Sequence, residues 1–134
     1  MNYRHAFHAG NFADVFKHTI LALLLESLRR KETPFCVIDV HAGIGRYDLH
    51  ADEALRTGEA QAGVLRLLGR SLPPDMSDYW RAVTAVNPPG GDGTELRFYP
   101  GSPRIARHLM RAQDRLLLVE LHPEDAHKIG RAHV

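Results

Sequence analysis

Residues 35–45 read Phe-Cys-Val-Ile-Asp-Val-His-Ala-Gly-Ile-Gly, an apolar run that ends in a turn containing two glycines. The run is rich in β-branched residues, which is typical of a buried parallel strand. Parallel sheets bind ligands beyond the carboxyl ends of their strands, so we expect a site around Gly43 and Gly45. The single cysteine, Cys36, lies inside the run, and we expect it to be a buried, unreactive thiol.

The elements on either side of this run predict an α/β fold. Residues 12–31 should form a helix that Asn11 can cap. Apolar residues recur along it at helical spacing, namely Phe12, Phe16, Ile20, Leu23, Leu24 and Leu28. Residues 116–121, Leu-Leu-Leu-Val-Glu-Leu, predict a second buried strand, preceded by a helix with Ser102 as its cap. Strand, helical crossover and strand form a βαβ unit, so the sheet should be parallel.

The segment between these elements has a different pattern. Residues 50–96 carry charged helical patches and proline-rich turns, which predict a small, mainly helical insertion. Inside it, Asn87-Pro88-Pro89-Gly90 resembles the Asn/Asp-Pro-Pro-aromatic motif of amino-group methyltransferases, but it lacks the aromatic residue. It also precedes the second strand, so we interpret it as a loop. We therefore expect one domain formed by residues 1–49 and 97–128, with residues 50–96 inserted between its two parts.

Composition and charge exclude several classes of protein. Hydrophobic residues make up 44% and charged residues 25% of the 134 positions, as in an ordinary globular domain, and the net charge of +1 points to no particular partner. No apolar stretch is long enough to span a membrane, and the N-terminus lacks the apolar region of a signal peptide, so we expect a cytoplasmic protein. The histidines lack the spacing of a metal site, so we expect no metal.

A nucleoside site is indicated by Glu120, which stands at the tip of the second strand beside the glycine turn. An acid in that position accepts hydrogen bonds from ribose hydroxyls, and His41 should line the same site. A dehydrogenase fingerprint would have its third glycine where Asp48 stands. S-adenosylmethionine has no phosphates, so a site that binds it does not need this third glycine. We therefore favour S-adenosylmethionine over a nicotinamide dinucleotide as the ligand.

Several strings then show a family resemblance that runs from residue 2 to about 127. They are Tyr3-Arg4-His5, Phe7-His8-Ala9-Gly10-Asn11, Ala13-Asp14-Val15, Lys17-His18, Asp39, His41-Ala42-Gly43, Gly45-Arg46-Tyr47, Arg56-Thr57-Gly58-Glu59, Tyr99-Pro100-Gly101-Ser102-Pro103 and Glu120-Leu121-His122-Pro123. In these strings the chain resembles the bacterial 23S ribosomal RNA adenine-N6 methyltransferases.

The resemblance implies a Rossmann-like, S-adenosylmethionine-dependent methyltransferase fold with a small helical insertion. It implies methylation of the N6 amino group of an adenine in 23S ribosomal RNA. We expect the protein to be a monomer. The positions that match cofactor-binding residues are His18, His41, Ser102 and Glu120. Tyr3 matches a residue that faces the RNA, with His5 and Lys17 nearby in the same motif.

The family carries catalysis on an Asp-Pro-Pro-Tyr motif after its fourth strand, and this sequence contains no such motif. We therefore expect an incomplete fold and an inactive fragment. Residues 129–134 correspond to one reading frame of a common sequencing-library adapter, so we expect the natural sequence to diverge near residue 129 and to continue. Two alternatives stay open: a non-catalytic module that binds nucleosides or RNA, and a Rossmann methyltransferase acting on DNA or a small molecule.

Overall fold

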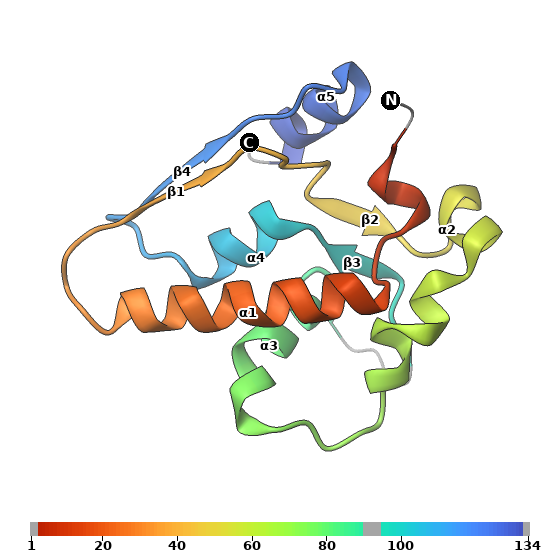
Figure 1. Ribbon diagram of the computed structural model, residues 1–134, viewed down its shortest axis with the longest axis horizontal. Coiled ribbons are helices and arrows are strands. Elements are labelled where there is room, and N and C mark those ends of the chain that lie inside the picture. The colour runs from red at the N-terminus through yellow and green to blue at the C-terminus, as the bar shows by residue number, and fades with distance from the viewer. Residues whose placement is uncertain (1–2, 90–94, 133–134) are drawn as a thin grey trace.

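The two predicted strands lie side by side in a mixed α/β fold. The computed structural model describes residues 3–89 and 95–132. Strands β1 (Cys36–Asp39) and β4 (Arg115–Leu118) pair in parallel, with Cys36 opposite Arg115 and Asp39 opposite Leu118. Helix α4 (Ser102–Leu109) lies beneath them, and α1 (Phe12–Arg29) lies below α4 (Figure 1). The predicted parallel βαβ connection is confirmed.

Among the residues that the structure describes, one face of this small sheet is covered and the other is exposed. Val37 and Leu116 are partly buried and pack against the core. The alternate side chains of the strands point the other way, so Ile38 is 61% exposed and Leu117 is 54% exposed. Cys36 is on the same side as Ile38 and is exposed, so the prediction of a buried thiol is wrong. An apolar run in the sequence identified the strand but not how many of its faces are covered.

A second strand pair was not predicted. Strands β2 (Arg46–Asp48) and β3 (Phe98–Pro100) run antiparallel, with Tyr47 opposite Tyr99. Each has three residues, too few for a periodic pattern to emerge from the sequence. The pair brings the glycine turn of β1 next to the start of α4, where the Gly101 N–H donates to the Gly45 carbonyl at 2.7 Å.

Helical structure fills most of the segment between β2 and β3. It comprises α2 (Asp52–Thr57), η2 (Glu59–Ala62), η3 (Val64–Leu67), η4 (Pro74–Met76) and α3 (Ser77–Ala85). After α3, the Asn87 amide donates to the Val83 and Phe98 carbonyls, and its side-chain oxygen accepts from the Phe98 N–H at 2.8 Å. Asn87 therefore ties a loop to β3, as expected; Gly90 and Gly91 of that turn lie outside the described residues.

The core lies where α1, α3, α4 and β3 meet. Tyr79 and Tyr99 are fully buried there, and their hydroxyls are 3.0 Å apart. Val64, Val83 and Ile105 are equally buried around them. Burial raises the pKa of both tyrosines, so their hydroxyls stay protonated.

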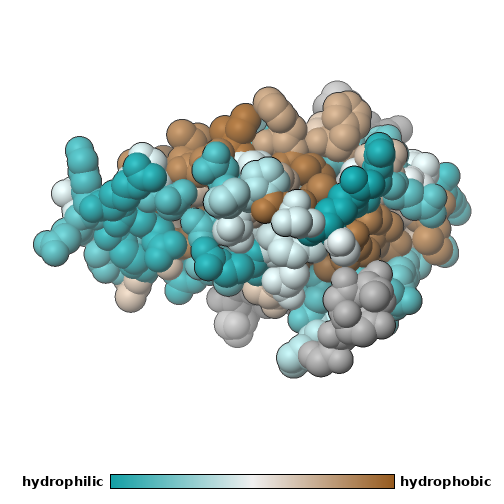
Figure 2. Space-filling view, turned by 90° about the horizontal axis from the view of Figure 1, so that it is seen from below, coloured by the Kyte–Doolittle hydropathy of each residue, from teal (hydrophilic) through white to brown (hydrophobic). Residues whose placement is uncertain are grey.

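Helix α1 begins as predicted but buries a different face. The Asn11 side chain accepts from the Asp14 N–H at 2.9 Å, which confirms the cap. The buried residues of the helix are Asp14, His18, Ala22 and Leu25. The regular apolar stripe is instead exposed, with Phe12 at 75%, Phe16 at 68%, Ile20 at 42%, Leu24 at 59% and Leu28 at 49%. Figure 2, viewed from below, shows hydrophobic side chains gathered in a band on this side of the molecule.

The C-terminal helix α5 (Pro123–Ala132) follows β4 and lies near the N-terminal segment (Figure 1). Ile129, the first residue of the stretch that resembles an adapter, is buried at 6% exposure. Residues 133–134 of that stretch lie outside the described part of the chain. Among the helices described, none combines the length and the apolarity needed to cross a bilayer.

Candidate functional site

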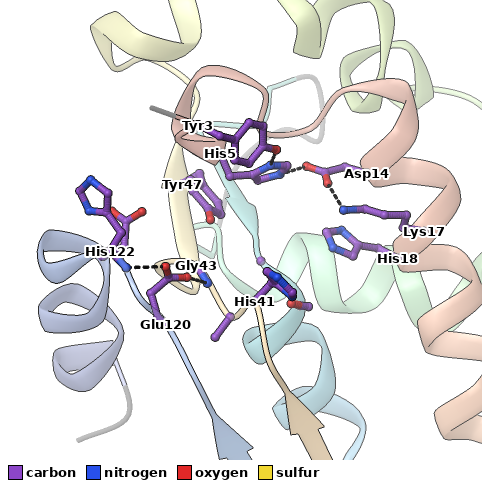
Figure 3. Close-up of a pocket in the computed structure, with 14 residues that line it drawn as sticks. Tyr3, His5, Asp14, Lys17, His18, His41, Gly43, Tyr47, Glu120 and His122 are labelled. Carbon is purple, nitrogen blue, oxygen red and sulfur yellow. Dashed lines mark hydrogen bonds and ion pairs between the residues drawn. The ribbon is translucent and has the colours of Figure 1, made fainter. Parts of the chain in front are cut away.

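All the site residues predicted from the sequence line one pocket. It opens at the carboxyl ends of β1 and β4, between the N-terminal segment and α5 (Figure 3). The predicted residues that line it are Tyr3, His5, Lys17, His18, His41, Ser102 and Glu120. They come from distant parts of the chain, so the fold rather than the sequence order brings them together.

Glu120 lies on one wall and holds the glycine turn. One carboxylate oxygen accepts from the Gly43 N–H at 2.7 Å, and the other accepts from the His122 N–H at 3.0 Å. Gly43 has φ +68°, and a Cβ at this position would collide with the Tyr47 hydroxyl. The turn therefore requires glycine here, both for its backbone conformation and for the closeness of Tyr47. Each oxygen of Glu120 keeps a second lone pair that can accept from a ligand.

Ser102 ties α4 to the end of β1. Its hydroxyl donates to a carboxylate oxygen of Asp39, whose other oxygen accepts from the His41 N–H at 3.1 Å. The predicted capping role of Ser102 is wrong, because Gly101 occupies the cap position and Ser102 is the first helical residue. The short β3 strand, which was not predicted, ends at Pro100, one residue before that cap. Asp39 thus fixes both Ser102 and the backbone of His41.

His18 is a neutral side chain in the floor of the pocket. It is 5% exposed, and its Nδ1 lies 2.9 Å from the Tyr99 hydroxyl. Burial is the main cause that lowers the pKa of His18 to about 4. The imidazole is therefore uncharged near neutral pH.

Asp14 organises the opposite wall and was missed as a site residue. One of its oxygens accepts from His5 Nε2 at 2.6 Å and from the Gly10 N–H at 2.9 Å. The other lies 3.5 Å from Lys17 Nζ and, within the described part of the chain, makes no hydrogen bond. Burial alone would raise the pKa of Asp14, but the hydrogen bonds from His5 and the Gly10 N–H help to lower it.

Tyr3 is the aromatic residue at the mouth of the pocket. Its hydroxyl lies 2.6 Å from His5 Nδ1, and its ring stacks on His8 with a centroid distance of 5.2 Å and an interplanar angle of 3°. The side chain is 54% exposed. The next residue, Arg4, pairs with Asp125 of α5 at 3.1 Å.

These walls suit different parts of a ligand. The wall with Glu120 and Asp39 offers carboxylate oxygens next to backbone N–H groups, which suits hydroxyl and amino groups. The wall with Tyr3 and Lys17 offers an aromatic face and a cation, which suits a planar base and a phosphate. In the described residues, no three His, Cys, Asp or Glu side chains group together as metal ligands.

Comparisons with known proteins agree on one family. The family model described as "Ribosomal RNA large subunit methyltransferase D, RlmJ" matches residues 32–132. The protein named "Ribosomal RNA large subunit methyltransferase J" from Escherichia coli (strain K12) is 50% identical over 126 residues, which cover 93% of this chain and 44% of that protein. The protein of the same name from Haemophilus influenzae (strain ATCC 51907 / DSM 11121 / KW20 / Rd) is 48% identical over 126 residues, with the same two coverages.

A solved structure supports the fold. The crystal structure of protein LPL1258 from Legionella pneumophila str. Philadelphia 1 superimposes with a TM-score of 0.82 at 35% sequence identity, covering 92% of this chain and 44% of that one. The chain thus spans less than half the length of the relatives that it matches. On the match over residues 32–132 and the identity to both curated relatives, the chain belongs to the RlmJ family of ribosomal RNA large subunit methyltransferases.

Proposed function

We propose that the full-length protein carrying this segment transfers a methyl group from S-adenosylmethionine to the N6 amino group of an adenine in 23S ribosomal RNA, in the cytoplasm and as a monomer. One observation carries the proposal. The residues expected on the cofactor side and those expected on the RNA side, from Tyr3 to Glu120, line one pocket at the carboxyl ends of two parallel strands. The names of the two curated relatives are consistent with this reaction.

The fold that we propose is Rossmann-like. Strands β1 and β4 with the α4 crossover would form part of its sheet, and residues 50–96 would be a helical insertion between β2 and β3. Residues 1–49 and 97–128 would together form the methyltransferase domain. The exposed apolar residues of β1, β4 and α1 support the expectation of an incomplete fold, because a complete domain normally covers such residues.

The cofactor would lie against Glu120, His41, Ser102 and His18. Glu120 would accept hydrogen bonds from the ribose hydroxyls with its remaining lone pairs. The neutral imidazole of His18 and the buried oxygen of Asp14 that lacks a hydrogen bond both suit a ligand that bears a positive charge. When bound, the cofactor supplies a methyl group on a sulfonium centre.

The RNA would enter on the side of Tyr3, His5 and Lys17. Tyr3 can stack on a base that has left its helix, and Lys17, whose side chain is 61% exposed, can pair with a phosphate. His5 holds the Tyr3 hydroxyl at 2.6 Å and so fixes how the ring faces the pocket.

The 134 residues would not complete the transfer. The lone pair of an exocyclic adenine nitrogen is delocalised into the ring, so that nitrogen is a poor nucleophile. It needs an acceptor for its amino protons and an aromatic side chain that holds it in line with the methyl group. The family's Asp-Pro-Pro-Tyr motif would supply both, and it is absent from this sequence.

The experiment that tests the two sides of the pocket uses Tyr3→Ala in the full-length protein. If Tyr3 holds the base, turnover on unmodified 23S ribosomal RNA should fall at least about tenfold, while cofactor affinity measured by calorimetry stays unchanged. Phe98→Ala, which removes an aromatic ring from β3 outside the pocket, controls for general loss of stability. A parallel fall in cofactor affinity would show that Tyr3 is structural and would remove it from the RNA side.

A further inference from the structure

Tyr3 is held from two sides by two histidines, each of which is held by a carboxylate. The Tyr3 hydroxyl meets Nδ1 of His5 at 2.6 Å, and Nε2 of the same ring meets Asp14 at 2.6 Å. The Tyr3 ring lies parallel to the ring of His8, whose Nδ1 meets Glu59 at 2.7 Å. A carboxylate thus anchors each of the two histidines.

The two carboxylates fix the direction of the hydrogen bonds that they make with the histidines. Ionised carboxylates only accept, so His5 donates to Asp14 from Nε2 and His8 donates to Glu59 from Nδ1. Burial, together with the negative charges of Asp14 and Glu59, raises the pKa of Tyr3, so its hydroxyl stays protonated beside Nδ1 of His5. The ring of Tyr3 therefore has a defined orientation before any ligand arrives.

Glu59 belongs to the insertion, which supports the N-terminal segment at further points. The Thr57 hydroxyl donates to the Phe7 carbonyl, and the Val64 N–H donates to the Gly10 carbonyl at 2.8 Å. Gly63 packs so tightly against this segment that a Cβ there would collide with the Gly10 carbonyl oxygen. The insertion is thus tied to the N-terminal segment along residues 7–10.

We propose that Glu59 and Asp14 are positioning residues, which act through His8 and His5 to hold Tyr3 ready for the substrate base. His8 covers one face of the Tyr3 ring, and the half-exposed side chain leaves the other face free to stack on a planar ligand. The insertion then contributes to substrate binding through Glu59 without touching the substrate. The inference rests on the proposed function, in which Tyr3 faces the RNA.

The first test does not depend on activity. In the full-length protein, proton NMR should show a nuclear Overhauser effect between the rings of Tyr3 and His8. Glu59→Ala should abolish it, and Glu59→Gln should keep it, because the amide oxygen still accepts from His8 Nδ1. Glu53→Ala, which removes the same charge from the first turn of α2, should leave it intact. A persistent effect in Glu59→Ala overturns the proposal.

The second test measures methyl transfer by the same variants. Glu59→Ala should lower kcat/KM for unmodified ribosomal RNA about tenfold, with KM for the cofactor within about twofold of wild type. Glu59→Gln should recover most of the loss. The double variant His8→Ala/Glu59→Ala should be no worse than His8→Ala alone, because Glu59 acts through His8.

The outcomes separate this inference from the proposed function. Two results would contradict the proposal that Glu59 acts through His8. One is a wild-type kcat/KM in Glu59→Ala; the other is a kcat/KM in the double variant that falls by the product of the two single losses. If the wild-type protein methylates no adenine, the proposed function fails, while the Tyr3–His8 contact in Glu59→Ala still decides whether Glu59 positions the tyrosine.

Discussion

Glu120 at the end of β4 accepts a hydrogen bond from the backbone N–H of Gly43 at 2.7 Å, and so joins the turn after β1 to the neighbouring strand. Its second carboxylate oxygen accepts a hydrogen bond from the His122 N–H at 3.0 Å. The carboxylate, which lines the pocket (Figure 3), is therefore fixed in place before a ligand binds. Such preorganisation lowers the entropy lost on binding.

Glu120→Gln tests whether that carboxylate holds the ribose of the cofactor. The amide keeps the shape of the side chain but loses its charge and one of its acceptor atoms, so cofactor binding should weaken by about 1–3 kcal/mol. Isothermal titration calorimetry on the full-length protein measures this directly. Glu95→Gln, an exposed acid outside the pocket, is the matched control. Equal affinity in wild type and Glu120→Gln would remove Glu120 from the cofactor site.

His18 should make the stability of the chain depend on pH. Its pKa is about 4 when folded, chiefly because of burial, against 6.5 when exposed. Between those values the unfolded chain binds the proton more readily, so the free energy of unfolding falls as pH drops from 6.5 towards 4. The loss should approach about 3 kcal/mol, and His18→Gln should lack it.

Urea unfolding at a series of pH values, compared between wild type and His18→Gln, gives this difference. The comparison cancels the contribution of other titrating groups that the two proteins share. Parallel stability curves for the two proteins from pH 6.5 to pH 4 would show that His18 is not held neutral by burial.

Gly63→Ala tests the close packing between the insertion and the N-terminal segment. The added Cβ would meet the backbone of Gly10 and Asn11, which cannot move without displacing the start of α1. We expect a loss of about 3 kcal/mol or more in the free energy of unfolding. Gly69→Ala is the control: Gly69 has φ +71° but open space around it, so the strain should cost only about 1–2 kcal/mol. Equal losses would contradict the packing described.

The exposed stripe of α1 should make the 134-residue chain associate with itself. Phe12 and Phe16 alone are 75% and 68% exposed, and exposed apolar patches favour association. Sedimentation velocity should show oligomers at micromolar concentration, and Phe16→Lys should shift them towards monomer. Ala85→Lys, which adds the same charge to an exposed position of α3, should not. A monomeric wild-type chain under these conditions would show that the stripe does not associate.

The parts of the fold that follow from local pattern could be predicted from the sequence. The parallel pair β1 and β4 was predictable because each strand is a short apolar run bounded by turn residues. The pair β2 and β3 was not, because three residues such as Arg46–Asp48 carry no periodic signal and pair only with a distant partner. Which faces are covered also depends on distant partners, as Cys36 and Phe16 show.

Some residues of the candidate site could likewise be predicted from the sequence, and others could not. Glu120 and His41 could be placed from the sequence because both follow strand ends, where ligands bind to parallel sheets. Asp14 and Glu59 could not, because their importance lies in contacts with His5 and His8 that only the folded chain creates. Both acids stand in strings that carry the family resemblance, but an acid in a first helical turn has an adequate local explanation in the helix dipole, and no local pattern shows which side chain it contacts.

Methyl transfer to 23S ribosomal RNA tests the central claim most directly. The full-length protein and the 134-residue chain are each incubated with unmodified 23S ribosomal RNA and labelled S-adenosylmethionine, and the digested RNA is analysed by mass spectrometry. We predict N6-methyladenosine with the full-length protein and none with the 134-residue chain, which lacks the Asp-Pro-Pro-Tyr motif. A full-length protein that leaves every adenine unmethylated, or methylation of adenine by the 134 residues alone, would contradict the account.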